Sequence, residues 1–440
     1  MLEYLTMRLG NGARIAVLGG GPAGSFFALY LLQYAAADRM DLEVDLFEWR
    51  SFSDRGPKGC NRCAGILSAS LLRNLGELDI NVPEEVIRAH IASYHLHSPF
   101  GVIDIPNPDP GAEILSVFRG GGPLSNAQGS LPSFDGFLLD CALRRGARLV
   151  HERVLRVDVE RRPRVFLEDG PRGYDLLVLA NGLNSGAIQI AGLPYRPPAT
   201  LAMSQDELHC RKEDIAQYFG SSVRAFLLPH TGLIFASVVP KGEFLNVSLL
   251  ARGGPPDLDG FLEHDLVKEA LPFPYKRSCG CRPRICVGRA ANYYGDGFVA
   301  IGDAAVSRLY KDGIGSALLS ARQAALTAMR YGTSRHDFAS HYAPFCRALH
   351  NDNRMGRIIF AVHNRTKDSR RFFRVQARLI NAEGSLPFTG QVFRKVLWGM
   401  FTGSYTYRQI LGMASNPKVV ARVAREYLTR HGARVVEAKL

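Results

Sequence analysis

The chain opens with hydrophobic and polar positions arranged as in one β-α-β unit. Residues 14–18 (Arg-Ile-Ala-Val-Leu) form a short apolar run, which is typical of a buried strand. A glycine-rich turn follows, and the apolar stretch from about Ala23 to Ala37 predicts a helix. Residues 43–48 then predict a second strand.

Similar patterns recur along the chain. Apolar runs predict buried strands at 175–180 and 298–301, and helical spacing predicts helices at 68–75, 134–145 and 315–330. Two short runs, 154–159 and 164–167, could pair as a hairpin. Residues 91–118 are strand-like but interrupted by four prolines, which favours a sheet edge or a winding substrate wall. Alternation over 199–250 predicts a second, antiparallel sheet, and the chain after Ser334 reads as mainly helical.

The composition is that of a globular protein. Apolar residues make up 46% and charged residues 22% of the 440 residues, which excludes a disordered or fibrous chain. No stretch approaches the roughly 20 consecutive apolar residues that a membrane-spanning helix needs. Residues 1–12 lack the apolar core and cleavage site of a signal peptide, so we expect a cytoplasmic protein.

The positive charge is concentrated at the C-terminal end. Residues 335–440 hold 19 Lys and Arg against 6 Asp and Glu, which equals the net charge of +13 of the whole chain. This imbalance indicates an anionic partner such as a membrane surface. Basic and apolar residues alternate over 393–401, which fits either an amphipathic helix on a bilayer or a helical cap packed on the main domain. We expect no nucleic-acid partner, because no nucleic-acid-binding motif is present.

A dinucleotide fingerprint occupies the first turn. Gly19-Gly20-Gly21-Pro22-Ala23-Gly24 satisfies G-x-G-x-x-G between a strand and a helix. Gly19 permits the tight turn, Gly21 lets a pyrophosphate approach the backbone, and Gly24 allows close helix–strand packing. The helix N-terminus favours phosphate, and Glu48, at the end of the second strand, is placed to bind a ribose diol.

A second motif points to one dinucleotide. Gly302-Asp303 ends a strand, and Gly313-Ile314-Gly315 opens a helix. With the fingerprint, these motifs resemble those of FAD-dependent oxidoreductases of the para-hydroxybenzoate hydroxylase type. The resemblance implies that FAD is the cofactor, that Asp303 binds its ribityl or ribose hydroxyls, and that residues 313–315 line the flavin. The segment 175–185 resembles the middle motif of that class, with Asn181 where Asp is usual.

The segment Cys60-Asn-Arg-Cys63-Ala-Gly-Ile-Leu-Ser68 resembles the cysteine motif of geranylgeranyl reductases, as Pro240-Lys-Gly242 resembles another motif of that family. The resemblance implies hydride transfer from flavin N5 to a C=C bond of a hydrophobic, isoprenoid or quinone-type substrate. It makes Cys63 the catalytic residue beside the flavin. The electron donor would be NAD(P)H, ferredoxin or a quinol.

The chain departs from these families at three places, one of which is Tyr310, where proline is common after the Gly-Asp motif. The reductases carry an aromatic run before the proline, of which Phe235 remains while Ser237 and Val239 replace the others. The wider class often has an arginine ahead of Phe134, where residues 131–133 are Leu-Pro-Ser.

The predicted fold is therefore α/β, with a Rossmann-type FAD-binding domain, an inserted mixed β-sheet substrate domain and a helical C-terminal region. The FAD-binding parts are expected at 1–90, 131–198 and 286–334. The substrate domain is expected at 91–130 and 199–285, and the basic helical region at 335–440.

Several alternatives stay open at this stage. The chain could be a flavin monooxygenase of the same fold. It could also be a non-catalytic flavoprotein that transfers electrons or binds peripherally to a membrane. The cysteine groups 60/63 and 279/281/286 fit a near-flavin role with reduced bystanders, a redox disulfide or a metal site, and we assign no metal ligand.

Overall fold

The first β-α-β unit forms as the apolar pattern predicts. The computed structural model describes residues 7–126, 129–183, 188–229 and 231–428. Strand β1 (Ala13–Leu18) pairs in parallel with β2 (Leu42–Phe47), and helix α1 (Pro22–Ala37) connects them. The side chains of Ile15 and Val17 are fully buried in the apolar cluster that surrounds this sheet.

A six-stranded Rossmann sheet is built around β1. Its strands come from three separate stretches of sequence and are parallel except for β20. In spatial order they are β20 (Tyr294–Gly295), β21 (Phe298–Ala300), β12 (Leu176–Leu179), β1, β2 and β8 (Arg148–Val150). Helix α1 packs between α7 (Gly313–Arg330) and α3 (Phe134–Arg144). The predicted mixture of parallel sheet and helices is confirmed.

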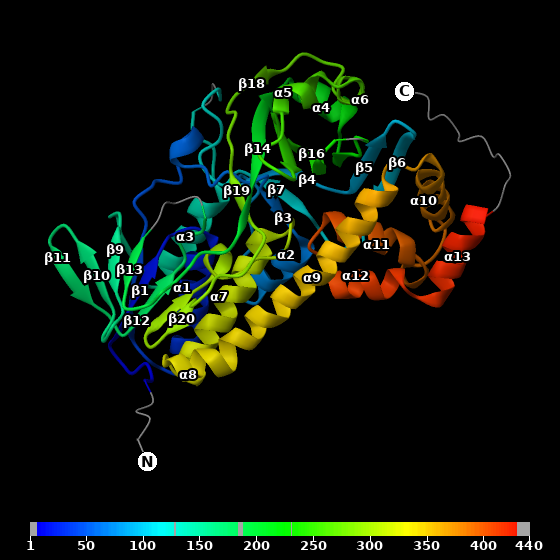
Figure 1. Ribbon diagram of the computed structural model, residues 1–440. Helices are drawn as coiled ribbons and strands as arrows, with labels where there is room; N and C mark the ends of the chain where they lie inside the picture. Colours follow the sequence, from blue (N-terminus) through cyan, green and yellow to red (C-terminus); the bar gives the residue numbers. More distant parts are fainter. Residues whose placement is uncertain (1–6, 127–128, 184–187, 230, 429–440) are drawn as a thin grey trace.

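A larger, mixed sheet stands beside the Rossmann sheet (Figure 1). Its main path is β18 (Lys276–Arg277), β14 (Thr200–His209), β17 (Phe244–Ala251), β16 (Leu233–Lys241), β15 (Ser222–Phe226), β5 (Ser93–Ser98) and β6 (Gly101–Pro106), and β19 (Arg284–Cys286) pairs with β14. The antiparallel pairing predicted for 199–250 is confirmed, and β6 forms the predicted edge. Only β15 and β5 pair in parallel along this path.

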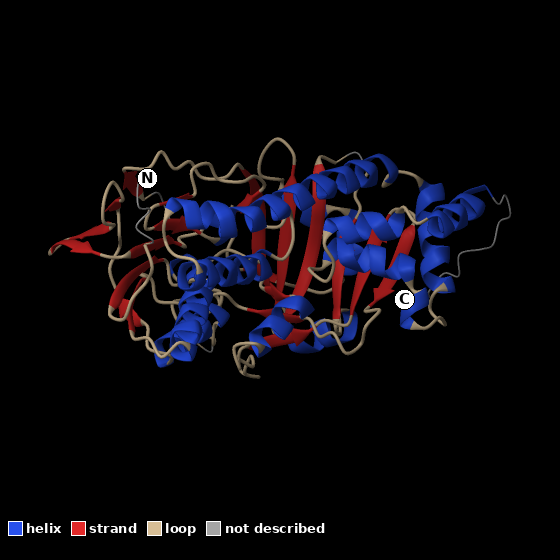
Figure 2. Ribbon diagram, turned by 90° about the horizontal axis from the view of Figure 1, so that it is seen from below, coloured by secondary structure: helices blue, strands red, loops and turns tan. Residues whose placement is uncertain are grey.

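The two faces of the larger sheet have different partners. Ala236, Val238 and Leu208 face α4 (Lys212–Tyr218), α5 (Leu258–Glu263) and α6 (Asp265–Ala270), with which they form one apolar cluster. Since side chains alternate along a strand, Phe235 and Ser237 point to the opposite face. Figure 2 shows helices on both sides of the long strands. We call the side that carries Phe235 and Ser237 the cavity face.

The other described strands form two small sheets. The four-stranded sheet has the order β11 (Gly170–Gly173), β10 (Arg164–Leu167), β9 (Arg156–Asp158) and β13 (Gln189–Ala191), and its β9–β10 pair is the predicted hairpin. The three-stranded sheet has the order β3 (Ile66–Leu67), β7 (Leu115–Val117) and β4 (Ile87–His90). It ties the cysteine segment to the larger sheet, because β7 and β4 contact β16, and α2 (Ala69–Gly76) follows β3 directly.

The C-terminal region is helical, as predicted. It comprises α8 (Arg335–Asp337), α9 (Ala343–Thr366), α10 (Arg370–Ala382), α11 (Val392–Phe401), α12 (Tyr407–Ala414) and α13 (Pro417–Leu428). Helix α9 runs from the Rossmann sheet toward the other C-terminal helices (Figure 1). Within the described ranges, no helix combines the length and apolar character needed to cross a membrane.

The position of α11 decides between the two interpretations of residues 393–401. The Trp398 side chain is 2% exposed and packs edge-on against Tyr94, and Leu397 is buried in the same cluster as Ile105 of β6. The proposal that these apolar side chains lie in a bilayer is therefore wrong, and the helical-cap interpretation is correct for this segment. Sequence could not separate the two, because a protein core and a membrane select the same amphipathic pattern.

Candidate active site

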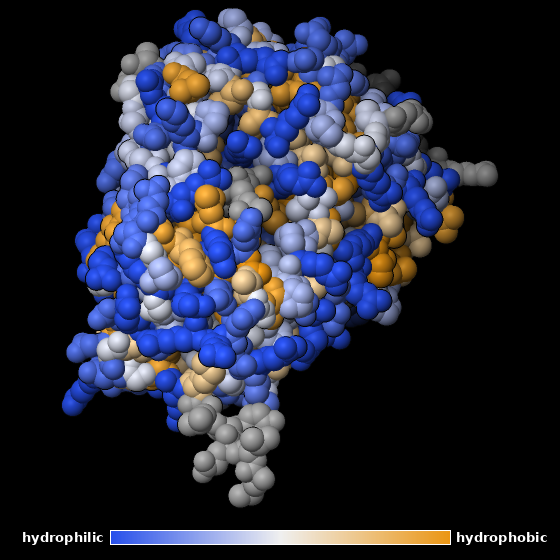
Figure 3. Space-filling model, turned by 60° about the vertical axis from the view of Figure 1, so that its left-hand side comes forward, coloured by the Kyte–Doolittle hydropathy of each residue, from blue (hydrophilic) through white to orange (hydrophobic). Residues whose placement is uncertain are grey.

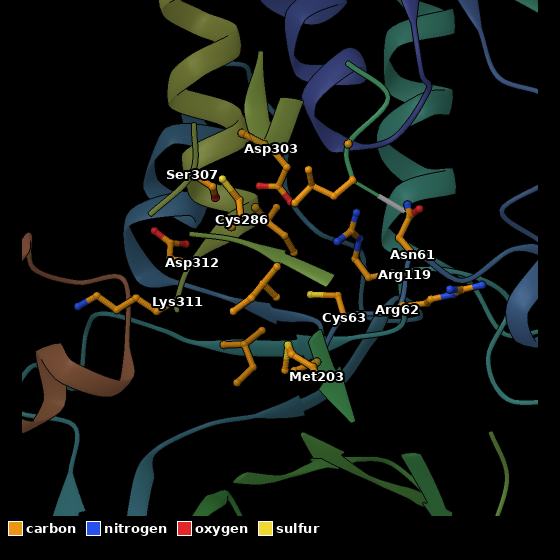
Figure 4. Close-up of a pocket in the computed structure, with 18 of the residues that line it drawn as sticks. Asn61, Arg62, Cys63, Arg119, Met203, Cys286, Asp303, Ser307, Lys311 and Asp312 are labelled. Carbon is orange, nitrogen blue, oxygen red and sulfur yellow. The ribbon is translucent and has the colours of Figure 1, made fainter. Parts of the chain in front are cut away.

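A cavity of about 390 Å³ lies between the Rossmann sheet and the cavity face of the larger sheet. Residues from distant parts of the chain line it, and most of the predicted site residues are among them. Those lining it are Gly19, Gly21, Pro22, Ala23, Glu48, Cys63, Asp303, Gly313 and Ile314. In Figure 4, Asp303 and Ser307 lie on one side of this space and Asn61 and Arg119 on the other, with Cys63 between them. The other three predicted residues, Gly24, Gly302 and Gly315, do not line the cavity.

The three fingerprint glycines serve different purposes. Gly19 has φ +114°, and a Cβ on Gly24 would overlap the carbonyl oxygen of Gly19, so both are needed for the chain's own packing. A Cβ on Gly21 would meet nothing closer than Asn61 Nδ2 at 3.6 Å and would project into open space. Gly21 is also the N-cap of α1 and has no side-chain cap, with Pro22 in the first turn. The second glycine thus leaves room for a ligand at a helix N-terminus.

Glu48 lies at the end of β2 as predicted, but its carboxylate is fully engaged. Gly20 N donates to Oε2 (3.2 Å), and Arg50 donates through its backbone N–H (3.1 Å), Nε (3.0 Å) and Nη2 (3.1 Å). These four bonds match the acceptor capacity of two carboxylate oxygens. A ribose can therefore bind Glu48 only if Arg50 releases part of its contact.

Asp303 follows β21 and faces the cavity. It accepts a hydrogen bond from Ser307, while burial raises the pKa of its carboxyl above the ordinary value. Additional hydrogen-bond donors from a ligand would stabilise the charged carboxylate. Gly302, directly before it, has φ +57° and lies so close to α1 that a Cβ would approach that of Ala23 to 2.9 Å.

The N-terminus of α7 is held by Asp312, which the sequence analysis did not identify. This residue has φ +49°, and its carboxylate accepts from Ser68 Oγ (2.9 Å) and Arg308 Nη1 (2.8 Å). A Cβ on Gly315 would collide with that carboxylate, so this glycine makes space for Asp312. Gly313 and Ile314 remain on the cavity wall.

Cys63 lies beside a buried ion pair that sequence reasoning also missed. Arg119 bonds Asp135 through Nε and through Nη2 (2.9 Å), and Asp135 is fully buried. Arg119 also hydrogen-bonds the Cys63 side chain. Burial alone lowers the pKa of the guanidinium, but Asp135 and Cys63 raise it above the ordinary value, so Arg119 stays charged. The sulfur of Cys63 therefore faces a positive charge.

The sequence offered little indication of the Arg119–Asp135 pair. The only signal for it was Asp135 itself, an acidic residue in the first turn of a helix whose other residues are largely apolar. That position usually reflects the helix dipole, so it gave no reason to look for a buried partner. Arg119 directly follows the three-stranded sheet, whose pairing brings it to α3.

The other cysteines fall into two surroundings. Cys60 lies close enough to Cys279 and Cys281 to influence both electrostatically, and burial raises the pKa of each of the latter two to about 12. Cys286 lines the cavity, and burial raises its pKa to about 12 as well. All eight cysteines are free thiols, and no group of three or more metal-ligating side chains gathers within the described ranges. The cavity has only Cys63 and Cys286 as thiols on its wall.

The fold is shared with flavoproteins. A flavoprotein/dehydrogenase from Cytophaga hutchinsonii aligns over 93% of this chain and 96% of its own, with 13% identity and a TM-score of 0.57. The p-nitrophenol 4-monooxygenase of Pseudomonas putida aligns over 89% and 98%, with 14% identity and a TM-score of 0.55. A 2-methyl-3-hydroxypyridine-5-carboxylic acid oxygenase aligns over 82% and 94%, with 16% identity and a TM-score of 0.54. No protein-family model and no curated protein matches this sequence.

The Arg119–Asp135 pair yields a stability prediction. Asp135→Asn leaves a buried guanidinium without its counter-charge, which lowers the free energy of unfolding by about 3–5 kcal/mol. Asp169→Asn removes the same charge from an exposed pair with Arg172 and changes it by less than about 1 kcal/mol. Urea unfolding of the two variants checks this. Equal losses in both would show that the buried pair has no special role.

Proposed function

We propose that the chain binds FAD in this cavity and acts as an oxidoreductase on a hydrophobic small molecule. The observation that carries this is the convergence of Gly21 and Asp303, from opposite ends of the Rossmann region, on one cavity. The shared fold with flavoproteins supports the same cofactor.

The residues present fit a dinucleotide with two phosphates. Gly21, Pro22 and Ala23 form the uncapped N-terminus of α1, where backbone N–H groups would bind the pyrophosphate. Asp303 would accept hydrogen bonds from ribityl hydroxyls, and Gly313 and Ile314 would lie along the flavin ring, while Gly315 makes space for Asp312. Arg50, once it shares Glu48 with a ribose, would be free to approach a phosphate. Three other predicted residues, Gly19, Gly24 and Gly302, would allow the tight turns and close backbone contacts that shape this site.

Two glycine variants test cofactor binding. Gly21→Ala puts a methyl group into space that only a ligand would use, so the variant should fold like the parent but lose most of its FAD. Gly24→Ala forces the turn apart through its collision with Gly19, so it should lower the unfolding midpoint as well. Flavin released on denaturation and thermal unfolding, measured on the same samples, separate the two effects. A parent chain that neither releases flavin nor takes up added FAD would refute the proposal.

The finer proposal is reduction of a C=C bond in an isoprenoid or quinone-type substrate. Bound FAD would supply the hydride. The chain's own residues would exclude water through apolar walls that include Met203, Phe235 and Phe401. Cys63 Sγ accepts hydrogen bonds from Gly65 N (3.4 Å) and Arg119, and the residue lines the cavity. In the proposed reaction, Cys63 would hold a proton close to the reacting atoms. NAD(P)H, ferredoxin or a quinol would supply the electrons.

A second candidate is a monooxygenase, favoured by the solved monooxygenases that share this fold. The two reactions differ in their need for oxygen. A reductase consumes a polyprenol under argon after the flavin has been reduced with dithionite, whereas a monooxygenase needs air to form product.

Cys63→Ala tests the proton-holding role. Turnover of the polyprenol under argon should fall at least about 100-fold, as for loss of a general acid, while the flavin content stays unchanged. Cys141→Ala, on α3 away from the cavity, serves as the control and should keep full activity. Full activity in Cys63→Ala would remove this residue from the mechanism.

We also propose that the C-terminal helices contact an anionic membrane surface. Val420 and Leu428 of α13 are 51% and 71% exposed, and this helix belongs to the basic end of the chain. By contrast, Figure 3 shows hydrophilic residues over most of another face of the molecule, with apolar groups scattered among them. Exposed apolar side chains among cations are typical of a helix that lies at a membrane interface.

Co-sedimentation with vesicles checks this contact. The chain should sediment with phosphatidylserine-containing vesicles and stay in solution with phosphatidylcholine alone. The double variant Val420→Asp/Leu428→Asp should lose the binding. Leu155→Asp, which changes an exposed leucine far from these helices, should retain it. Binding that is equal for both vesicle types, or unchanged in the double variant, would contradict the proposal.

A further inference from the structure

A row of polar side chains crosses the cavity face of the larger sheet. Gln205 of β14 is paired with Ser248 of β17, and Ser248 is paired with Ser237 of β16, so the three side chains lie next to one another. All three line the cavity. The row continues on β15 and β5 as Ala225 and Leu96, which are apolar. The polar part therefore covers only one half of the cavity floor.

A buried ion pair fixes the orientation of this row. Lys241 is 1% exposed, and its Nζ lies 3.2 Å from Oε1 of Glu207. A carboxylate paired in this way only accepts hydrogen bonds, so Asn246 must turn its Nδ2 toward Glu207 (2.9 Å). Its Oδ1 then accepts from Ser248 Oγ (2.7 Å). Ser248 Oγ in turn accepts from Gln205 Nε2 (2.7 Å).

The consequence is a defined acceptor on the cavity floor. With Nε2 directed to Ser248, the Oε1 atom of Gln205 must face the other way. Its one contact within the described part of the chain is the thiol of Cys281 at 4.0 Å, the outer limit for a sulfur donor. Ser237 Oγ makes no hydrogen bond to any described residue. Gln205 is only 3% exposed, and a buried polar atom without a full partner is destabilising, which a hydrogen bond from a bound ligand would relieve.

We infer that Gln205 and Ser237 are specificity residues that bind a hydroxyl group on an otherwise hydrophobic substrate. Gln205 Oε1 accepts a hydrogen bond from the hydroxyl group, and Ser237 Oγ donates one to the hydroxyl oxygen. The two charges behind the row neutralise each other, so the row selects a neutral donor rather than a diphosphate. Glu207, Asn246 and Ser248 are positioning residues that act through Gln205. The inference deepens the proposed oxidoreductase function and rests on it for the role of the cavity.

Matched alcohols and ethers test the inference by calorimetry, with and without added FAD. The probes are farnesol and farnesyl methyl ether, and 4-butylphenol and 4-butylanisole. In at least one pair, the hydroxyl compound should bind about tenfold or more tightly than its ether, because methylation removes the donor. Gln205→Leu should bring this ratio close to one while the affinity for the ether stays the same. Ser237→Ala should reduce the ratio in part.

Two further variants separate recognition from a structural effect. Ser204→Ala changes the neighbouring residue of Gln205 on the opposite face of β14 and should keep the ratio. Glu207→Gln/Lys241→Met removes both charges together and frees the Asn246 amide to turn, so the ratio should fall. Ser237 is only half-buried, so Ser237→Ala should fold even if Gln205→Leu does not. An unchanged alcohol-to-ether ratio in Ser237→Ala would then count against the inference.

Equal binding of alcohol and ether by the parent chain overturns the inference. So does an unchanged alcohol-to-ether affinity ratio in a folded Gln205→Leu variant. Failure of both alcohols to bind overturns it as well. These results are distinct from a failure to bind flavin. The ratio is measured in the absence of FAD as well, so a chain that takes up no FAD would refute the cofactor proposal and leave this result standing.

Discussion

The carboxylate of Asp312 joins the three parts of the chain that enclose the cavity. Its side chain is 2% exposed and accepts from Ser68, the last residue of the cysteine segment, and from Arg308. Arg308 also donates to the carbonyl oxygen of Gly403, between α11 and α12 (2.9 Å). A Cβ on Gly403 would collide with Asp312, so the C-terminal region approaches the N-terminus of α7 at backbone distance. The left-handed backbone of Asp312 is the local cost of this junction, and such strain is typical of functional sites.

This junction explains why the basic C-terminal region does not form a separate module. Helix α11 ends at Phe401, which stacks on Tyr94 and lines the cavity, so the region that carries the excess charge also forms part of the cavity wall. Its apolar residues therefore divide into two groups. Those of α11 serve the core, and Val420 and Leu428 of α13 remain exposed.

The sequence predicted what depends on local pattern and missed what depends on distant partners. The strand, turn and helix around Gly19–Gly24 follow from an apolar run and from glycines whose steric roles are local. Glu48 could be placed at a strand end, but its saturation by Arg50 depends on side-chain geometry that no spacing reveals. Arg119 and Asp135 escaped notice because the pairing of β3, β7 and β4 is what brings them together. The polar row escaped for the same reason, since Gln205, Ser248 and Ser237 become neighbours only in the register of the sheet.

The replacement of aromatic residues by Ser237 and Val239 takes on a different meaning in this register. Val239 occupies the row of Asn246 and Glu207, and Ser237 occupies the row of Ser248 and Gln205. An aromatic side chain at position 237 would cover the polar row and leave its acceptor without any route to a ligand. The small hydroxyl residue instead exposes an acceptor that a buried ion pair holds in place. Because an unpaired buried acceptor is costly, the presence of this network supports the inferred substrate with a donor at that point, and the apolar residues around it support a substrate that is otherwise hydrocarbon.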